Sequence, residues 1–179
     1  MKNGNFALLP FCVLAIKLTP VKKQKVIEAI IERLKQDLGL YYKAALASRA
    51  EATHEQSKAE NKYDTRGLEA SYLARGQSKQ VAELELAIDK FAALPVRDFT
   101  AADPIDTGAL VELSSKTETN IYFIGPKAGG TEVVCGKKEI LVITPESPLG
   151  SQLIGKKQGD ACQLTLPGRK EKLTITNVR

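Results

Sequence analysis

The sequence has 179 residues, of which 43% are hydrophobic and 26% charged, a composition typical of a globular protein of one or two domains. The net charge of +5 is spread thinly, with thirteen basic and eleven acidic residues in 21–94 and ten and eight in 105–179. No basic stripe is available to neutralise a phosphate backbone, so we expect any contact with nucleic acid to be indirect, through another protein.

The cysteines and the histidine exclude several classes of site. Cys12, Cys135 and Cys162 are odd in number and widely spaced, which favours a reducing, cytoplasmic compartment over a disulfide framework. His54 is the only histidine and there is no CxxC pair, so the sequence predicts no zinc site. Neither Cys135 nor Cys162 has a histidine base in its own half of the chain, which argues against a nucleophilic hydrolase.

Residues 1–19 form a segment of different composition. The apolar run from Phe6 to Ile16 is too short to span a bilayer and contains Pro10. Lys2 is the one basic residue before the run, and no A-x-A cleavage site follows it. A signal peptide and a membrane anchor are therefore both disfavoured. We expect residues 1–19 to be a disordered extension or a misassigned start, with the folded protein beginning near Thr19.

Residues 20–94 predict two long helices that pair in an antiparallel coiled-coil hairpin. Thr19 and Pro20 provide a capping hydroxyl followed by proline at the first helical position. Apolar and small residues then recur in alternating steps of four and three, the pattern of a coiled-coil seam. In the first helix they are Ile27, Ile31, Leu34, Leu38, Tyr41, Ala45, Ser48 and Ala52; in the second they are Ala70, Ala74, Gln77, Val81, Leu84, Ile88 and Phe91.

In both helices the seam residues are large at the base of the hairpin and small near its tip. That match is what an antiparallel pair requires, and Leu94-Pro95 ends the second helix. Arms of about 30 residues predict a rod roughly 45 Å long at ~1.5 Å per residue. We expect this rod to act as a lever or probe with little core beyond its seam, and its tip to fall near 53–66.

Residues 95–104 contain two prolines and no periodicity, and predict a linker. A second domain follows over 105–179, in which alternating apolar residues predict a small antiparallel sheet. The expected strands are 109–115, 120–125, 139–145, 162–166 and 172–178, with one or two helical turns over 148–154.

This order of elements, together with the string SPLGSQLIGKKQGD at 147–160, resembles the Gre family of bacterial transcription elongation factors. The resemblance implies an α+β fold, in which the long coiled-coil hairpin precedes an FKBP-like domain with a short helix. It also implies a cytoplasmic protein that binds RNA polymerase and is not itself an enzyme. The globular domain would dock on the polymerase, and the coiled coil would enter its secondary channel.

In that family two acidic residues at the tip, in a D-x-x-E pattern, help to hold a second Mg²⁺ at the polymerase active site. Carboxylate oxygens suit such a cation, and two-metal hydrolysis needs it close to the first ion. The cation would therefore be shared with the polymerase, and the resemblance implies no cofactor of the chain's own.

The tip of this chain departs from the family pattern. Asp64 is present, but Gly67 and Leu68 occupy the places where the glutamate is expected. The nearest substitutes are Glu60 and Glu69, and the stretch resembles a branch with a KY[DE]T signature. The tip candidates are Asp64, Glu60, Glu69, Lys62, Tyr63 and Arg66, with Asp64 and Glu60 the candidates for Mg²⁺ in complex with polymerase.

Two interpretations of the tip stay open. In one, Asp64 with Glu60 or Glu69 donates oxygens to Mg²⁺ and the protein stimulates cleavage of backtracked RNA. In the other, the tip occupies the channel and modulates transcription without cleavage, since Lys62 and Arg66 could pair with Asp64 and weaken its affinity for a metal.

The docking surface implied by the resemblance is the loop-to-helix corner at Ser147, Pro148 and Gly150. Proline at this position is also typical of a helix start, and we expect Leu149 to fill the core rather than contact a partner.

Two other functions remain as alternatives. A prolyl isomerase needs an aromatic-lined pocket, but Tyr122 and Phe123 are adjacent on a strand and must face opposite sides. A coiled-coil adaptor or chaperone should expose an apolar stripe, and the off-seam residues Leu40, Tyr42, Leu46 and Leu73 do not form a continuous one. The protein is expected to be a monomer.

Overall fold

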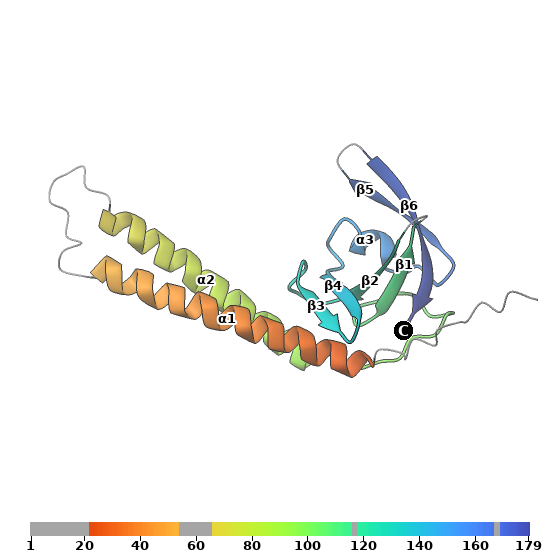
Figure 1. Ribbon diagram of the computed structural model, residues 1–179, viewed down its shortest axis with the longest axis horizontal. Helices are drawn as coiled ribbons and strands as arrows, with labels where there is room; N and C mark the ends of the chain where they lie inside the picture. The colour runs from red at the N-terminus through yellow and green to blue at the C-terminus, as the bar shows by residue number, and fades with distance from the viewer. Residues whose placement is uncertain (1–21, 54–65, 116–117, 167–168) are drawn as a thin grey trace, which may run out of the picture.

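The structure is a computed structural model that describes residues 22–53, 66–115, 118–166 and 169–179. Two long helices lie side by side and project from one end of a compact domain built on a twisted sheet (Figure 1). We call the helical pair the arm and the sheet domain the body. This arrangement confirms the predicted α+β class with an N-terminal helical hairpin.

The arm consists of α1, Lys23–Thr53, and α2, Arg66–Ala92. The seam is most deeply buried near the body, where Ile27 and Leu34 of α1 and Phe91 of α2 are at most 4% exposed. Towards the other end Ser48 is buried, as a seam of small residues requires. Tyr41 is 42% exposed although it occupies a seam position, because two helices alone are too slender to enclose a tyrosine ring.

The body contains one six-stranded sheet in the order β3-β4-β2-β1-β6-β5. Its strands are β1 Leu110–Ser114, β2 Thr119–Ile124, β3 Glu132–Cys135, β4 Lys138–Ile143, β5 Ala161–Leu166 and β6 Arg169–Val178. Every pairing is antiparallel except that between β2 and β4, which run parallel on either side of a crossover that contains β3. The predicted antiparallel sheet is thus confirmed, with the parallel β2–β4 pairing as the one exception.

β3 was not predicted from the sequence, because it has only four residues and pairs with a single neighbour, β4. The helical turns expected over 148–154 are present as the short helix α3, Gly150–Leu153. Leu149 and Leu153 are both buried under the sheet, so the expectation that Leu149 fills the core is confirmed.

The sheet carries a hydrophobic cluster on each face. One cluster lies against α3 and contains Tyr122, Ile124, Leu149, Leu153 and Ile175. The other joins the sheet to the base of the arm, and it unites Val26, Ile30 and Phe91 of the helices with Phe123 and Val142 of the strands. The lower part of the arm therefore has a core well beyond its seam, whereas the sequence predicted little.

Residues 95–104, expected as a linker, pack against the start of α1. Phe99 is buried, and two cations lie over its ring, with Lys23 Nζ 4.6 Å and Arg97 Cζ 4.7 Å from the ring centroid. Lys23 Nζ also donates a hydrogen bond to the Arg97 carbonyl. We call this segment the strap, since it fastens the end of α2 to the beginning of α1.

Within the described ranges, no helix is both long enough and apolar enough to cross a membrane.

Candidate functional site

The tip of the arm falls mostly outside the described residues. Asp64, Glu60, Lys62 and Tyr63 belong to 54–65, and their predicted roles stay predictions. Arg66 begins α2, and Glu69 lies exposed in its first turn. A carboxylate there is stabilised by the helix dipole, which by itself explains an acidic residue at position 69. Among the described residues there is no group of three acidic, cysteine or histidine side chains that could hold a metal ion.

The outer half of the arm exposes large apolar side chains. Leu40, Tyr42, Leu46 and Leu73, the off-seam residues, are between 52% and 66% exposed. The tip-proximal Tyr72 is 66% exposed as well. Among the described elements none forms a second layer over this part of the arm, which is two helices thick (Figure 1).

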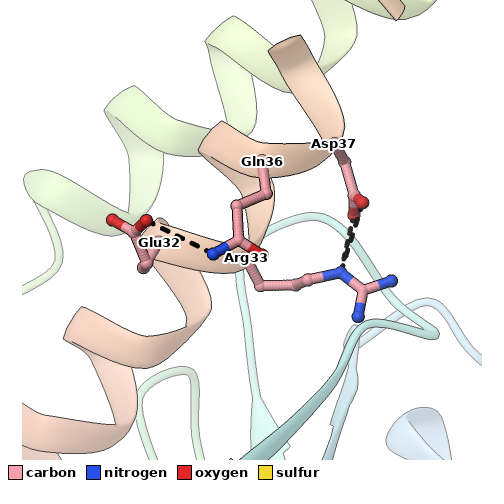
Figure 2. Close-up of polar contacts among 4 residues, drawn as sticks. All are labelled: Glu32, Arg33, Gln36 and Asp37. Carbon is pink, nitrogen blue, oxygen red and sulfur yellow. Dashed lines mark hydrogen bonds and ion pairs between the residues drawn. The ribbon is translucent and has the colours of Figure 1, made fainter. Parts of the chain in front are cut away.

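Polar and charged side chains on the inner part of α1 form pairs along the helix. Figure 2 shows the Arg33 guanidinium directed at Asp37, with Nε 3.1 Å from Oδ2, and Gln36 directed back at Glu32. Such exposed pairs four residues apart contribute only about 0.3–0.5 kcal/mol each. They favour the helix without creating a binding site.

The side-chain hydroxyl of Ser147 holds the corner at 144–150, because it both donates and accepts a hydrogen bond. Ser147 Oγ donates to the Thr144 carbonyl at 2.8 Å and accepts from the Gly150 backbone N–H at 3.0 Å. The backbone N–H of Ser147 donates to the same carbonyl at 3.0 Å. These bonds fix the turn that leads into α3, so Ser147 has a structural role in addition to any contact with a partner.

Gly150 is buried at the centre of the corner. A Cβ at this position would lie 1.9 Å from the Thr144 carbonyl oxygen, a contact that no side chain can make. The close packing of two backbone segments therefore explains why glycine is present, and Gly150 is not available as a contact surface. Pro148, by contrast, is exposed at the outside of the turn.

The corner is also tied to the neighbouring strand. Gln152 Nε2 donates to the Pro148 carbonyl at 3.1 Å, and Gln152 Oε1 accepts from the backbone N–H of Gln163 in β5 at 3.1 Å. The outward face of Pro148 is thus presented on a rigid support. Of the three predicted docking residues, Pro148 is the one whose side chain can meet a partner without loss of internal structure.

The cysteine thiols and the aromatic residues of the body can be compared with what a hydrolase or a prolyl isomerase would need. Burial raises the pKa of both Cys135 and Cys162, so neither is a ready thiolate nucleophile. Tyr122 belongs to one hydrophobic cluster and Phe123 to the other, as their adjacency on the strand predicts. The two rings therefore do not converge on a single pocket for proline.

The junction of arm and body was missed by the sequence reasoning. It depends on Phe91, whose ring centroid is 6.1 Å from that of Phe123, and on Gly125, above which the Phe91 ring passes. Gly125 directly follows β2 and precedes Pro126. Lys23 and Phe99 complete the junction, and burial lowers the pKa of the Lys23 ammonium group.

Comparison with known proteins finds similarity over the body. Residues 101–179 match the family described as transcription elongation factor, GreA/GreB, C-term. Over 101 residues the chain is 33% identical to the transcription elongation factor GreA of Streptococcus suis strain 05ZYH33, covering 55% of this chain and 59% of that protein. It is also 33% identical over 90 residues to GreA of Streptococcus gordonii, covering 49% of this chain and 52% of that protein.

Two solved structures were also found to be similar. One is the GreA factor homolog 1 (Gfh1) protein of Thermus thermophilus, at 23% identity and a TM-score of 0.36, covering 85% of this chain and 96% of that one. The other is GreA/GreB from Nitrosomonas europaea, at 19% identity and a TM-score of 0.33, covering 62% of this chain and 91% of that one. The chain spans between about half and six tenths of the length of the curated relatives named above.

Proposed function

We propose that this chain binds RNA polymerase and modulates elongation with its helical arm, because residues 101–179 match the GreA/GreB family of transcription elongation factors. The observation that carries the proposal is the junction of this family domain with a long two-helix arm through a shared core. In this proposal the body docks through the exposed face of Pro148, supported by Ser147. The arm then enters the secondary channel of the polymerase.

The shape and the chemistry of the arm support this role. Its outer half is two helices thick, which suits a narrow channel, and the described part of the chain has no metal cluster of its own. In this proposal any catalysis takes place at the polymerase active site, and the chain acts as an accessory factor. Contact with nucleic acid would be indirect, through the polymerase.

In the first form of the proposal the arm stimulates cleavage of backtracked RNA. Asp64, with Glu60 or Glu69, would supply carboxylate oxygens to a Mg²⁺ ion at the polymerase centre, the type of ligand that this cation prefers. The chemistry supplied by the ion is the activation of water for hydrolysis. The contribution of the chain is to place those oxygens and to exclude other groups from the channel.

A second form, channel occupation without cleavage, is favoured by one specific observation. Gly67 stands where a D-x-x-E pattern beginning at Asp64 would place its glutamate. Without the paired carboxylate the tip would hold a cation weakly. The arm would then act by obstructing or reshaping the channel.

A stalled, backtracked elongation complex with labelled RNA and Mg²⁺ tests both forms. Shortening of the RNA by the wild-type chain that is lost with Asp64→Ala would support the cleavage form. Asp37→Ala, on the inner part of α1, is the control and should leave any cleavage unchanged. No shortening, together with displacement of a labelled secondary-channel binder, would support the second form.

If the RNA is not shortened and the labelled secondary-channel binder is not displaced, the polymerase proposal is overturned. An adaptor role would then be tested by self-association at micromolar protein concentration, which the exposed apolar residues of the outer arm could mediate.

A further inference from the structure

The seam of the arm changes character at its fifth position from the body. Counted outward from Ile27 in α1 the fifth seam residue is Tyr41, and counted outward from Phe91 in α2 it is Gln77. Each lies roughly 21 Å along its helix from the first seam residue, at ~1.5 Å per residue. Since Ile27 and Phe91 belong to one buried cluster, Tyr41 and Gln77 lie at the same level of the arm.

Neither residue of this pair completes the seam. Tyr41 is 42% exposed, whereas Leu34, two seam positions nearer to the body, is 1% exposed. The side-chain oxygen of Gln77 is buried, and within the described residues no group donates a hydrogen bond to it. A buried acceptor that has lost its water without gaining a donor disfavours the closed seam, so a movement that admits water to Gln77 is favoured.

Both helices carry a glycine at this level. Gly39 lies two residues before Tyr41, and Gly76 lies directly before Gln77. A Cβ at either glycine would find no atom within 4 Å apart from its own helix, so packing requires neither glycine. A glycine inside a helix leaves the backbone more freedom than an alanine does, and here both helices are weakened at one place.

Ser78 adds a second feature that favours a bend in α2. Its Oγ donates at 2.8 Å to the carbonyl of Ala74, four residues earlier in the same helix. A serine that bonds back in this way often bends its helix, and glycine and serine together are a usual place for a kink. Gly76 and Ser78 lie on either side of Gln77, so the turn of α2 that bends most readily is the one that contains the unpaired oxygen.

The parts of the arm on either side of this level differ in their support. On the inner side Leu34, Ala87 and Phe91 are buried in the core shared with the sheet, which fixes this part to the body. On the outer side the described elements place nothing over the two helices, which project away from the body (Figure 1). A bend at this level therefore moves the outer part and leaves the inner part in place.

We propose that the arm has a joint, formed by Gly39, Tyr41, Gly76, Gln77 and Ser78, at which its outer part bends relative to its inner part. The inference does not depend on RNA polymerase binding, because the joint is a property of the chain itself. A bend of about 20°, the size of a marked helix kink, displaces a residue about 15 Å beyond the joint by roughly 5 Å. An arm with such a joint can follow a curved cavity, which a straight rod cannot.

Distances between two spin labels, measured by double electron–electron resonance in the full-length chain, test the joint. Cys12→Ser and Cys135→Ser provide the background, with the buried Cys162 retained. One label is placed on the body at Thr174→Cys, an exposed position of β6.

The second label is placed either beyond the joint, at Arg49→Cys, or before it, at Lys35→Cys; both positions are exposed on α1. The joint predicts a distance distribution for Arg49 at least about twofold broader than that for Lys35, because only the outer label moves with the bend.

Replacement of the two glycines should remove the difference. Gly39→Ala combined with Gly76→Ala is expected to narrow the outer distribution to about the width of the inner one, because alanine restricts the backbone of both helices. Thr53→Ala is the matched control, since Thr53 Oγ1 also donates to a carbonyl of its own helix, that of Arg49, at 2.9 Å, but does so beyond the joint. This control should leave the outer distribution unchanged.

Three results would overturn the proposal. One is a pair of equally narrow distributions, which would show that the arm is a straight and rigid rod. Another is a pair of equally broad distributions, which would place the movement at the junction of arm and body. The third is a broad outer distribution that persists when both glycines are replaced, which would place the movement nearer to the tip.

Hydrogen exchange gives an independent check through Gln77. Gln77→Leu replaces the unpaired oxygen by an apolar group, and Gln80→Leu makes the same change at an exposed position outside the seam. The joint predicts that the amides of residues 78–81 exchange about tenfold more slowly in Gln77→Leu than in the wild type, because they exchange through the local opening that the bend produces. An effect no larger than that of Gln80→Leu would also overturn the proposal.

Discussion

The Phe91 ring lies over Gly125 so closely that a side chain at position 125 has no room. Phe91 Cζ is 2.7 Å from the place where a Cβ of residue 125 would stand, and a Val142 methyl carbon is 2.8 Å from it. The Phe91 ring of the arm can thus contact the end of β2 because residue 125 has no side chain. This contact fixes how near α2 can approach the end of β2.

Gly125→Ala should therefore destabilise the protein by about 1–3 kcal/mol, the usual cost of overpacking a core. Urea denaturation followed by circular dichroism measures the change. Because the arm and the sheet share this core, we expect the helical and the sheet signals to shift together. A change below about 0.5 kcal/mol would mean that Phe91 can move aside without cost.

Gly39→Ala should have the opposite effect on the free energy of unfolding. Gly39 lies inside α1, and a Cβ there would find no atom within 4 Å apart from its own helix. The substitution should stabilise the protein by about 0.5–1 kcal/mol, because alanine loses less backbone entropy than glycine in a helix. The same denaturation experiment measures it, and a loss of stability would contradict the open surroundings of this residue.

Gly150→Ala should be the most damaging of the glycine substitutions. The new methyl group would lie 1.9 Å from a backbone oxygen, that of Thr144, which cannot rotate away as a side chain can. We expect a loss of at least about 3 kcal/mol, since the corner and α3 must both shift. Thermal unfolding measures the loss, and a wild-type melting temperature would contradict the geometry of the corner.

Pro148→Ala should separate binding from stability. Pro148 is exposed and uses only its carbonyl within the fold, so the free energy of unfolding should change by less than about 0.5 kcal/mol. If the corner docks on RNA polymerase, the affinity should fall about tenfold, equivalent to about 1.4 kcal/mol. Fluorescence anisotropy of a labelled chain with purified polymerase measures it, with the exposed Thr174→Ala on β6 as the control. Equal affinities of the two variants would place docking elsewhere.

Asp103 should make stability depend on pH in the acid range. The backbone N–H and the hydroxyl of Thr100 both donate to its carboxylate at 2.8 Å, and these bonds lower its pKa below the usual 3.8. A lowered pKa in the folded state gives a contribution that is present above the unfolded pKa and lost as the pH falls through the folded one.

The comparison of wild type with Asp103→Asn tests this. The difference in their free energies of unfolding should be larger at about pH 6 than at about pH 2, because protonation removes the advantage of the wild type. Urea titrations at the two pH values measure it. A difference that does not change with pH would show that the Thr100 hydrogen bonds contribute nothing that depends on the charge.

The elements of this protein follow from local patterns in its sequence. Alternating steps of four and three, from Ile27 to Ala52 and from Ala70 to Phe91, predicted two paired helices, since every third or fourth residue lies on one face of a helix. Alternation of apolar residues predicted five of the six strands. The resemblance of SPLGSQLIGKKQGD to the Gre family pointed to the family that the comparison found for residues 101–179.

Contacts between distant parts of the chain were decided only by the tertiary structure. Val26 and Ile30 lie off the seam and are fully buried in the cluster that joins the arm to the sheet, and Phe99 is buried in the cluster on the other face, with Lys23 and Arg97 over its ring. No local pattern marks these positions, since periodicity specifies which residues share a face but not what that face meets. The partner of a face is fixed by packing between segments far apart in sequence, as at Phe91 and Gly125.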